Sequence, residues 1–88
     1  MNIENIKNLL ENAINEHRRG NLEAADKIYN DILKIDKYNY DANHLHGTIL
    51  SQKQRYIEAV NYFSIAYEKS TPTCELLNNY AVALRNLR

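Results

Sequence analysis

Apolar residues recur along the chain at helical spacing, in five segments separated by short polar stretches. Within residues 1–18, the apolar positions are spaced three or four residues apart, at Ile3, Ile6, Leu10, Ala13 and Ile14. Side chains at that spacing share one face of an α-helix. The same spacing predicts further helices over residues 22–35, 40–53, 56–70 and 73–87. The pattern therefore predicts an all-α protein of five helices.

Turn-forming residues separate these segments. Gly20 ends the first helix, because glycine readily adopts the positive φ of a tight helix–helix turn. Asn21 is expected to cap the second helix. Pro72 and Thr73 stop the fourth helix and open the fifth, since proline suits a first helical turn and threonine caps one.

The helices repeat in pairs with a period of about 34 residues. Ala25 and Tyr29 of the second helix reappear as Ala59 and Phe63 of the fourth. This period indicates a helix-turn-helix repeat. It divides a single domain, residues 1–88, into repeat one (about 6–39), repeat two (about 40–73) and the first helix of a third repeat (about 74–88).

A column of small residues supports this alignment. Gly47 lies in the middle of the third helix, where glycine costs about 1 kcal/mol relative to alanine. It aligns with Ala13 one repeat earlier and Ala81 one repeat later. Small side chains at a helix crossing let the partner helix approach closely. We expect the three helices that carry these residues to share one packing geometry.

The residues of both repeats resemble the tetratricopeptide repeat family. The resemblance rests on Gly20-Asn21-Leu22, Ala25, Tyr29, Ile32, Gly47, Tyr56, Glu58-Ala59, Phe63 and Ala66, with residues 79–84 resembling the opening of a further repeat. It implies a right-handed superhelical solenoid of antiparallel helix pairs. It also implies a scaffold that binds proteins or peptides. The order of residues is similar, more narrowly, to the N-terminal repeats of bacterial proteins with an O-linked N-acetylglucosamine transferase-like domain.

The family resemblance implies a binding surface on the inner side of the solenoid, lined by the first helix of each repeat. The residues expected there are Leu10, Ile14, His17, His44, Leu45, Thr48, Gln52, Asn78, Asn79, Val82 and Arg85. A carboxylate clamp of the kind that holds chaperone tails is excluded, because leucine, isoleucine and glutamate stand at four of its positions (Leu10, Ile14, Leu45 and Glu75). Of the asparagine ladder used by the transferase relatives, only Asn79 is present. A mixed apolar and polar groove remains, although its aliphatic residues could equally be ordinary packing between helices.

The last helix suggests a second kind of contact. We expect it to lack the partner helix that would cover Leu76, Ala83 and Leu87. An uncovered apolar stripe tends to be hidden by another chain. A homodimer through the C-terminal helix is therefore a further hypothesis.

The composition narrows the choice of partners. The chain has 88 residues, with 11 basic and 11 acidic side chains and a formal net charge of +0. Nucleic-acid binding requires a clustered positive surface, so we expect no such partner. There is no apolar run of the length that spans a membrane and no signal peptide, and Cys74 is the single cysteine. We expect a cytoplasmic protein.

Catalytic and metal chemistry find little support. His44 and His46 are two residues apart, so on a helix they point to different sides and cannot chelate together. Cys74 has no histidine placed by local spacing to act as its base. We expect no enzyme activity, metal or cofactor. The sequence predicts a non-catalytic protein- or peptide-binding scaffold, as a piece of a longer chain. The alternatives are the substrate-recognition arm of a bacterial glycosyltransferase-like enzyme and a self-association module.

Overall fold

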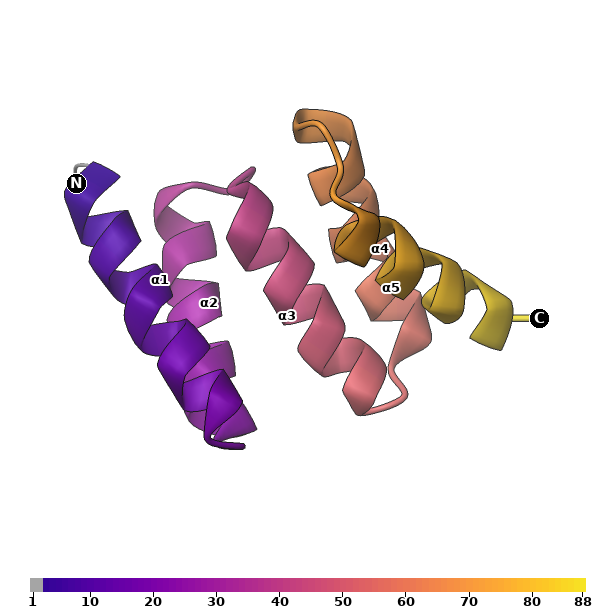
Figure 1. The fold of residues 1–88 in the computed structure, drawn as a ribbon, viewed down its shortest axis with the longest axis horizontal. Coiled ribbons are helices and arrows are strands. Elements are labelled where there is room, and N and C mark those ends of the chain that lie inside the picture. The colour runs from indigo at the N-terminus through magenta and orange to yellow at the C-terminus, as the bar shows by residue number, and fades with distance from the viewer. Residues whose placement is uncertain (1–2) are drawn as a thin grey trace.

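The computed structural model describes residues 3–88, which form five α-helices and no strand (Figure 1). The predicted all-α class is therefore confirmed. The helices are α1 (Ile3–Arg18), α2 (Leu22–Ile35), α3 (Tyr40–Gln52), α4 (Tyr56–Lys69) and α5 (Cys74–Asn86). Their bounds lie close to the predicted ones. Residues 1 and 2, which the first predicted helix includes, lie outside the described part.

Each helix packs against the next one in the chain, and successive helices run in alternating directions (Figure 1). In this view α1 lies in front of α2, and α5 lies in front of α4. Helix α3 occupies the middle of the molecule and contacts α2, α4 and α5. Side chains of α3 can therefore contact residues of the repeat before it and of the repeat after it.

The core consists of two clusters that follow the repeat. The first contains Ala13, Ala25, Tyr29, Ile32, Ala42 and Ile49, and the second contains Leu50, Ala59, Phe63, Ala66, Leu76 and Ala83. Residues one repeat apart occupy corresponding buried positions in the two clusters: Tyr29 corresponds to Phe63, and Ala42 corresponds to Leu76. The sequence period thus corresponds to a period in packing.

The small-residue column behaves differently at its third position. Ala13 and Gly47 are buried, as expected, but Ala81 is exposed. Ala13 belongs to the cluster shared with α2, and Gly47 lies against α4. No helix follows α5 among the described residues, so Ala81 has no corresponding neighbour.

The helix ends confirm two of the three expected signals. Gly20 has φ +84°, and the Thr73 hydroxyl accepts a hydrogen bond from the Leu76 backbone N–H (3.1 Å). The prediction for Asn21 is wrong, because its side chain makes no cap hydrogen bond to α2. Its Nδ2 instead donates to Glu16 Oε2 at 3.0 Å, which ties the turn back to α1.

Candidate functional site

Two adjoining hollows on the α1, α3 and α5 side form the candidate binding surface. The larger, about 460 Å³, lies between the C-terminal part of α1 and the N-terminal parts of α3 and α5. It is lined by Ile14, His17, Arg18, Tyr40, Asp41, His44, Leu45, Thr73 and Glu75. The smaller, about 230 Å³, is lined by Thr48, Ser51, Gln52, Tyr56, Asn79 and Val82. We call the two together the inner groove.

Most of the residues predicted for the inner face line this groove. They are Ile14, His17, His44 and Leu45 in the larger hollow, and Thr48, Gln52, Asn79 and Val82 in the smaller. Leu10 does not line either hollow and packs against the first core cluster. Asn78 and Arg85 are exposed and also lie outside the lining. The predicted alignment of helix faces therefore holds best along α3.

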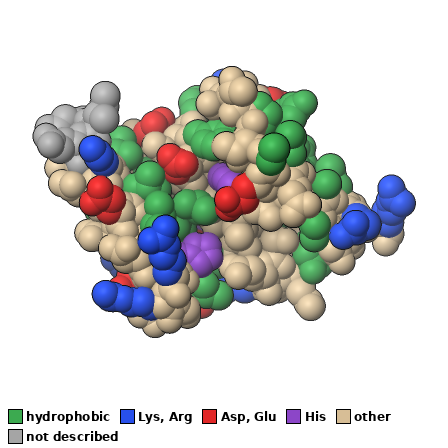
Figure 2. Space-filling model, viewed as in Figure 1, with side chains coloured by type: hydrophobic (Ala, Val, Ile, Leu, Met, Phe, Trp, Pro, Cys, Tyr) green, Lys and Arg blue, Asp and Glu red, His purple; other side chains and the backbone are tan. Residues whose placement is uncertain are grey.

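The face seen in Figure 2 mixes charge types rather than collecting one sign. Histidine side chains reach the surface near its middle, with both acidic and basic side chains beside them, and further basic side chains lie toward both ends of the view. Apolar side chains lie between these groups. Such a surface suits a ligand that offers both apolar and polar contacts.

His17 joins three helices at one edge of the groove. The Tyr29 hydroxyl lies 3.3 Å from His17 Nδ1, and His17 Nε2 lies 3.3 Å from Gln52 Oε1. Burial and the nearby carboxylates of Asp26 and Asp41 raise the pKa of Tyr29 to about 12, so this phenol keeps its proton. The amide oxygen can only accept, so the imidazole hydrogen lies on Nε2.

His44 and Asn79 connect α3 with α5 in the middle of the groove. Asn79 Nδ2 donates to His44 Nε2 (3.3 Å) and to Thr48 Oγ1 (3.4 Å). The Asn79 side-chain oxygen accepts no hydrogen bond from any described residue, and it is therefore free to accept one from a ligand. The amide is held in place from one side and open on the other.

The protonation state of His44 follows from its surroundings. Its side chain is nearly fully buried, and this desolvation lowers its pKa, against an opposing effect of Glu75 and Asp41. The neutral imidazole presents a lone pair at Nε2, which is what the Asn79 donor requires. Glu75 Oε1 lies 4.0 Å from the same nitrogen and would pair with it after protonation.

The structure corrects the predicted self-association surface. Leu76 and Ala83 are fully buried in the second core cluster, because α5 turns that side toward α3 and α4. Only Leu87 of the three predicted residues is exposed, at 43%. Leu77 and Leu84, which were not predicted, are exposed to a similar degree.

Sequence reasoning missed two polar contacts that fasten the helices beside the groove. The Thr73 backbone N–H donates to the Tyr40 hydroxyl at 3.0 Å, which fixes the start of α5 against α3. His46 Nδ1 and Asp26 Oδ1 form a short hydrogen bond across the α2–α3 interface. Both pairs are far apart in sequence, and no local spacing signals them.

The described residues contain no cluster of three or more histidine, cysteine, aspartate or glutamate side chains that could hold a metal ion. Among the described helices, none has the length and apolar character needed to cross a bilayer. Cys74 is exposed at the start of α5.

No family profile matches the chain. No curated protein sequence is significantly similar to it.

Proposed function

We propose that the protein is a cytoplasmic, non-catalytic scaffold that binds an extended peptide or protein segment in the inner groove. In this proposal the chain comprises two tetratricopeptide repeats and the first helix of a third, wound as a right-handed solenoid. The observation that carries the proposal is the open side of the Asn79 amide, which His44 and Thr48 of α3 hold in a hollow that Val82 of α5 also lines.

The groove offers the two kinds of contact that an extended peptide requires. Its free acceptor is the Asn79 side-chain oxygen, which suits a peptide N–H. Its apolar contacts are Ile14, Leu45 and Val82, which are partly exposed along the three helices. Peptide side chains would occupy the hollows while the backbone runs past Asn79.

The proposal is tested by selecting ligands from a random peptide display library and measuring the affinity of the selected peptides. Leu45→Arg puts a long charged side chain into the larger hollow and should weaken binding by at least about tenfold. The control is Lys27→Ala, on the exposed side of α2, which should leave the affinity for the selected peptides unchanged. Failure to select any peptide, or equal affinity for the Leu45 variant and wild type, would contradict the proposal.

A second candidate function is self-association through the outer face of α5. Leu77, Ala81 and Leu84 stand one repeat after Asn43, Gly47 and Leu50, and those three α3 residues are all buried. In α5 the same face is exposed, with Leu77 at 43% and Leu84 at 47%. We propose that a second copy of the chain covers it, with Ala81 providing room at the crossing.

The narrower hypothesis of a recognition arm for a glycosyltransferase-like enzyme rests on the order of residues in the sequence. Asn79 is the one rung of the asparagine ladder present in the groove. This hypothesis stays a prediction, and the length of the natural reading frame would test it.

A further inference from the structure

Asn43 is a buried polar residue at a position where the other repeats carry leucine. One repeat earlier the residue is Leu9, and one repeat later it is Leu77. Asn43 has no exposed surface. A buried side-chain amide at an apolar position requires hydrogen-bond partners on both its nitrogen and its oxygen.

The nitrogen of this amide is fully engaged. Asn43 Nδ2 donates to the Lys37 backbone oxygen at 3.1 Å and to the Asn39 backbone oxygen at 2.7 Å. These two acceptors determine the orientation of the amide, because a flip would set Oδ1 against two carbonyl oxygens. The side-chain oxygen must therefore point the other way.

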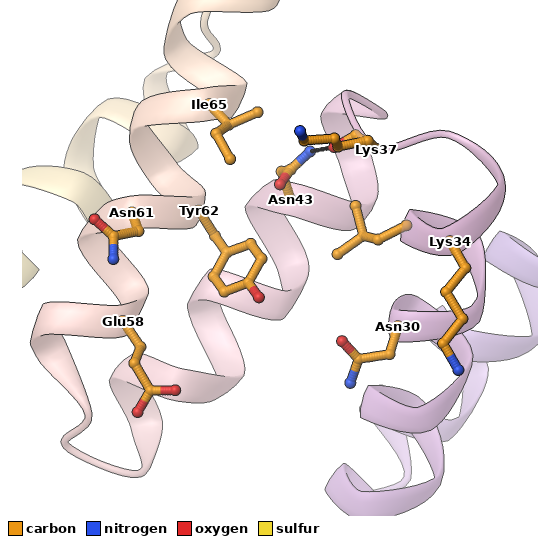
Figure 3. A pocket seen from close by; sticks show the side chains of 9 residues that line it. Asn30, Lys34, Lys37, Asn43, Glu58, Asn61, Tyr62 and Ile65 are labelled. Atoms are coloured by element: carbon orange, nitrogen blue, oxygen red, sulfur yellow. Dashed lines mark hydrogen bonds between the residues drawn. The ribbon is translucent and has the colours of Figure 1, made fainter.

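That oxygen accepts no hydrogen bond from any described residue. Figure 3 shows it directed into the space between α2 and α4, while the nitrogen faces the chain at Lys37. A buried carbonyl oxygen without a donor destabilises the folded state, so its presence calls for an explanation.

The space that it faces is a pocket of about 520 Å³, on the α2 and α4 side of the molecule. We call it the outer pocket. It is lined by Asn30, Leu33, Lys34, Lys37, Asn43, Glu58, Asn61, Tyr62 and Ile65. Its volume falls in the range of small-molecule sites.

The charges around the outer pocket favour an anion. Glu58 Oε1 already accepts from Arg55 Nε at 2.7 Å, so its charge is balanced. The Lys34 ammonium is 4.0 Å from Asp31 at an exposed position, which is a weak pair. Lys37 Nζ lies 5.4 Å from the centre of the Tyr38 ring, an exposed side chain. Two ammonium groups on the α2 side can therefore turn to a ligand.

We propose that the outer pocket binds a small aromatic carboxylate whose ring carries a hydrogen-bond donor, such as an indole N–H or a phenol O–H. The donor satisfies Asn43 Oδ1, the ring lies among Leu33, Tyr62 and Ile65, and Lys34 and Lys37 pair with the carboxylate. Asn43 has no exposed surface in the free protein, so the side chains that line the pocket must move apart to admit the ring. This site is separate from the inner groove and does not depend on it.

The probe is N-acetyl-L-tryptophan, titrated into the full chain by isothermal calorimetry. We expect saturable binding of this probe. Binding should be at least about tenfold weaker for N-acetyl-L-tryptophanamide, which lacks the carboxylate, and for N-acetyl-L-phenylalanine, which lacks the hydrogen-bond donor on the ring. The double variant Lys34→Ala/Lys37→Ala should bind N-acetyl-L-tryptophan at least about tenfold more weakly. Lys27→Ala, on the same helix but outside the pocket, should match wild type.

Asn43→Leu tests the role of the amide directly. It should abolish binding, and its fold is checked by circular dichroism because the variant loses the hydrogen bonds to Lys37 and Asn39. The lysine variants and the probe comparison do not depend on that check. No saturation with N-acetyl-L-tryptophan up to about 10 mM would overturn the proposal. Equal binding of all three probes, or unchanged affinity in the double lysine variant, would also overturn it.

Discussion

Gly47 of α3 lies directly against the ring of Phe63 in α4. A Cβ atom added at Gly47 would stand 2.7 Å from Phe63 Cε1 and 3.3 Å from the Ala59 backbone oxygen. Phe63 is fully buried, so its ring cannot swing into solvent to make room. The absence of a side chain at residue 47 is therefore a requirement of the α3–α4 crossing, and it explains why a helix tolerates glycine at its centre.

This contact predicts that Gly47→Leu destabilises the protein by about 1–3 kcal/mol, because the added atoms overpack the crossing. The matched control is Ala24→Leu, at an exposed position of α2, which should change stability by less than about 0.5 kcal/mol. Urea denaturation of both variants provides the comparison. Equal stability of Gly47→Leu and wild type would show that the crossing is not as close as described.

A second prediction concerns the turn after α3. Gln54 has φ +63°, a left-handed conformation that costs a non-glycine residue about 1–2 kcal/mol. Gly20 holds the equivalent place one repeat earlier, with φ +84°. Gln54→Gly should stabilise the protein by up to about 1 kcal/mol, since relief of strain exceeds the added freedom of the unfolded chain.

The control for this substitution is Lys53→Gly, because Lys53 has φ −88° and carries no such strain. That variant should lose stability, by about 0.5–1 kcal/mol. Thermal unfolding of the pair separates the two effects. A Gln54→Gly protein that melts below wild type would argue against a strained turn.

The third prediction follows from the buried imidazole of His44. Its folded-state pKa lies below the ordinary value of 6.5, so the unfolded chain takes up this proton first as the pH falls. The associated stability is fully present above pH 6.5 and is lost as the pH drops from there toward the lower folded pKa. Wild-type melting temperature should therefore fall below that pH.

The variant His44→Gln keeps a polar side chain without a titrating proton, so its melting temperature should fall less steeply over the same pH range. The other titrating groups are common to both proteins and cancel in the difference. Glu75→Gln removes a carboxylate that favours the charged imidazole, so it should steepen the loss. Parallel pH profiles for wild type and His44→Gln would contradict the assignment.

A fourth prediction tests the α5 face. Light scattering should show a dimer for wild type and a monomer for Leu84→Glu and for Leu87→Glu, because a carboxylate cannot be buried unpaired in an apolar interface. Tyr38→Glu, at another exposed apolar residue, should leave the dimer intact. A wild-type protein that is monomeric at high concentration would contradict self-association through α5.

Sequence periodicity predicted the helices and the residues along α3 well, because spacing alone decides which side chains share a helix face. It predicted the burial of α5 less well. Leu76 and Ala83 stand one repeat after Ala42 and Ile49, which are both buried, and the analogy with α3 would have assigned them to the core. The exposed face of α5 is instead the one that carries Leu77 and Leu84.

Side-chain contacts that depend on the course of a turn or on the packing of two helices could not be predicted from helical periodicity. Asn21 turns to Glu16 rather than to its own helix, and His46 meets Asp26 of the preceding repeat. The Asn43 oxygen is left unpaired because of the course of the loop before α3, where two backbone carbonyl oxygens accept hydrogen bonds from the nitrogen of the same amide. No pattern of residue types encodes such geometry locally.

Ligand binding in the inner groove can be observed residue by residue, by following the backbone amide signals of ¹⁵N-labelled protein by NMR during titration with a peptide selected from the display library. We expect shifts concentrated at residues of α1, α3 and α5 around His44, Leu45 and Asn79. Shifts confined to α2 and α4, with the groove signals unmoved, would contradict it.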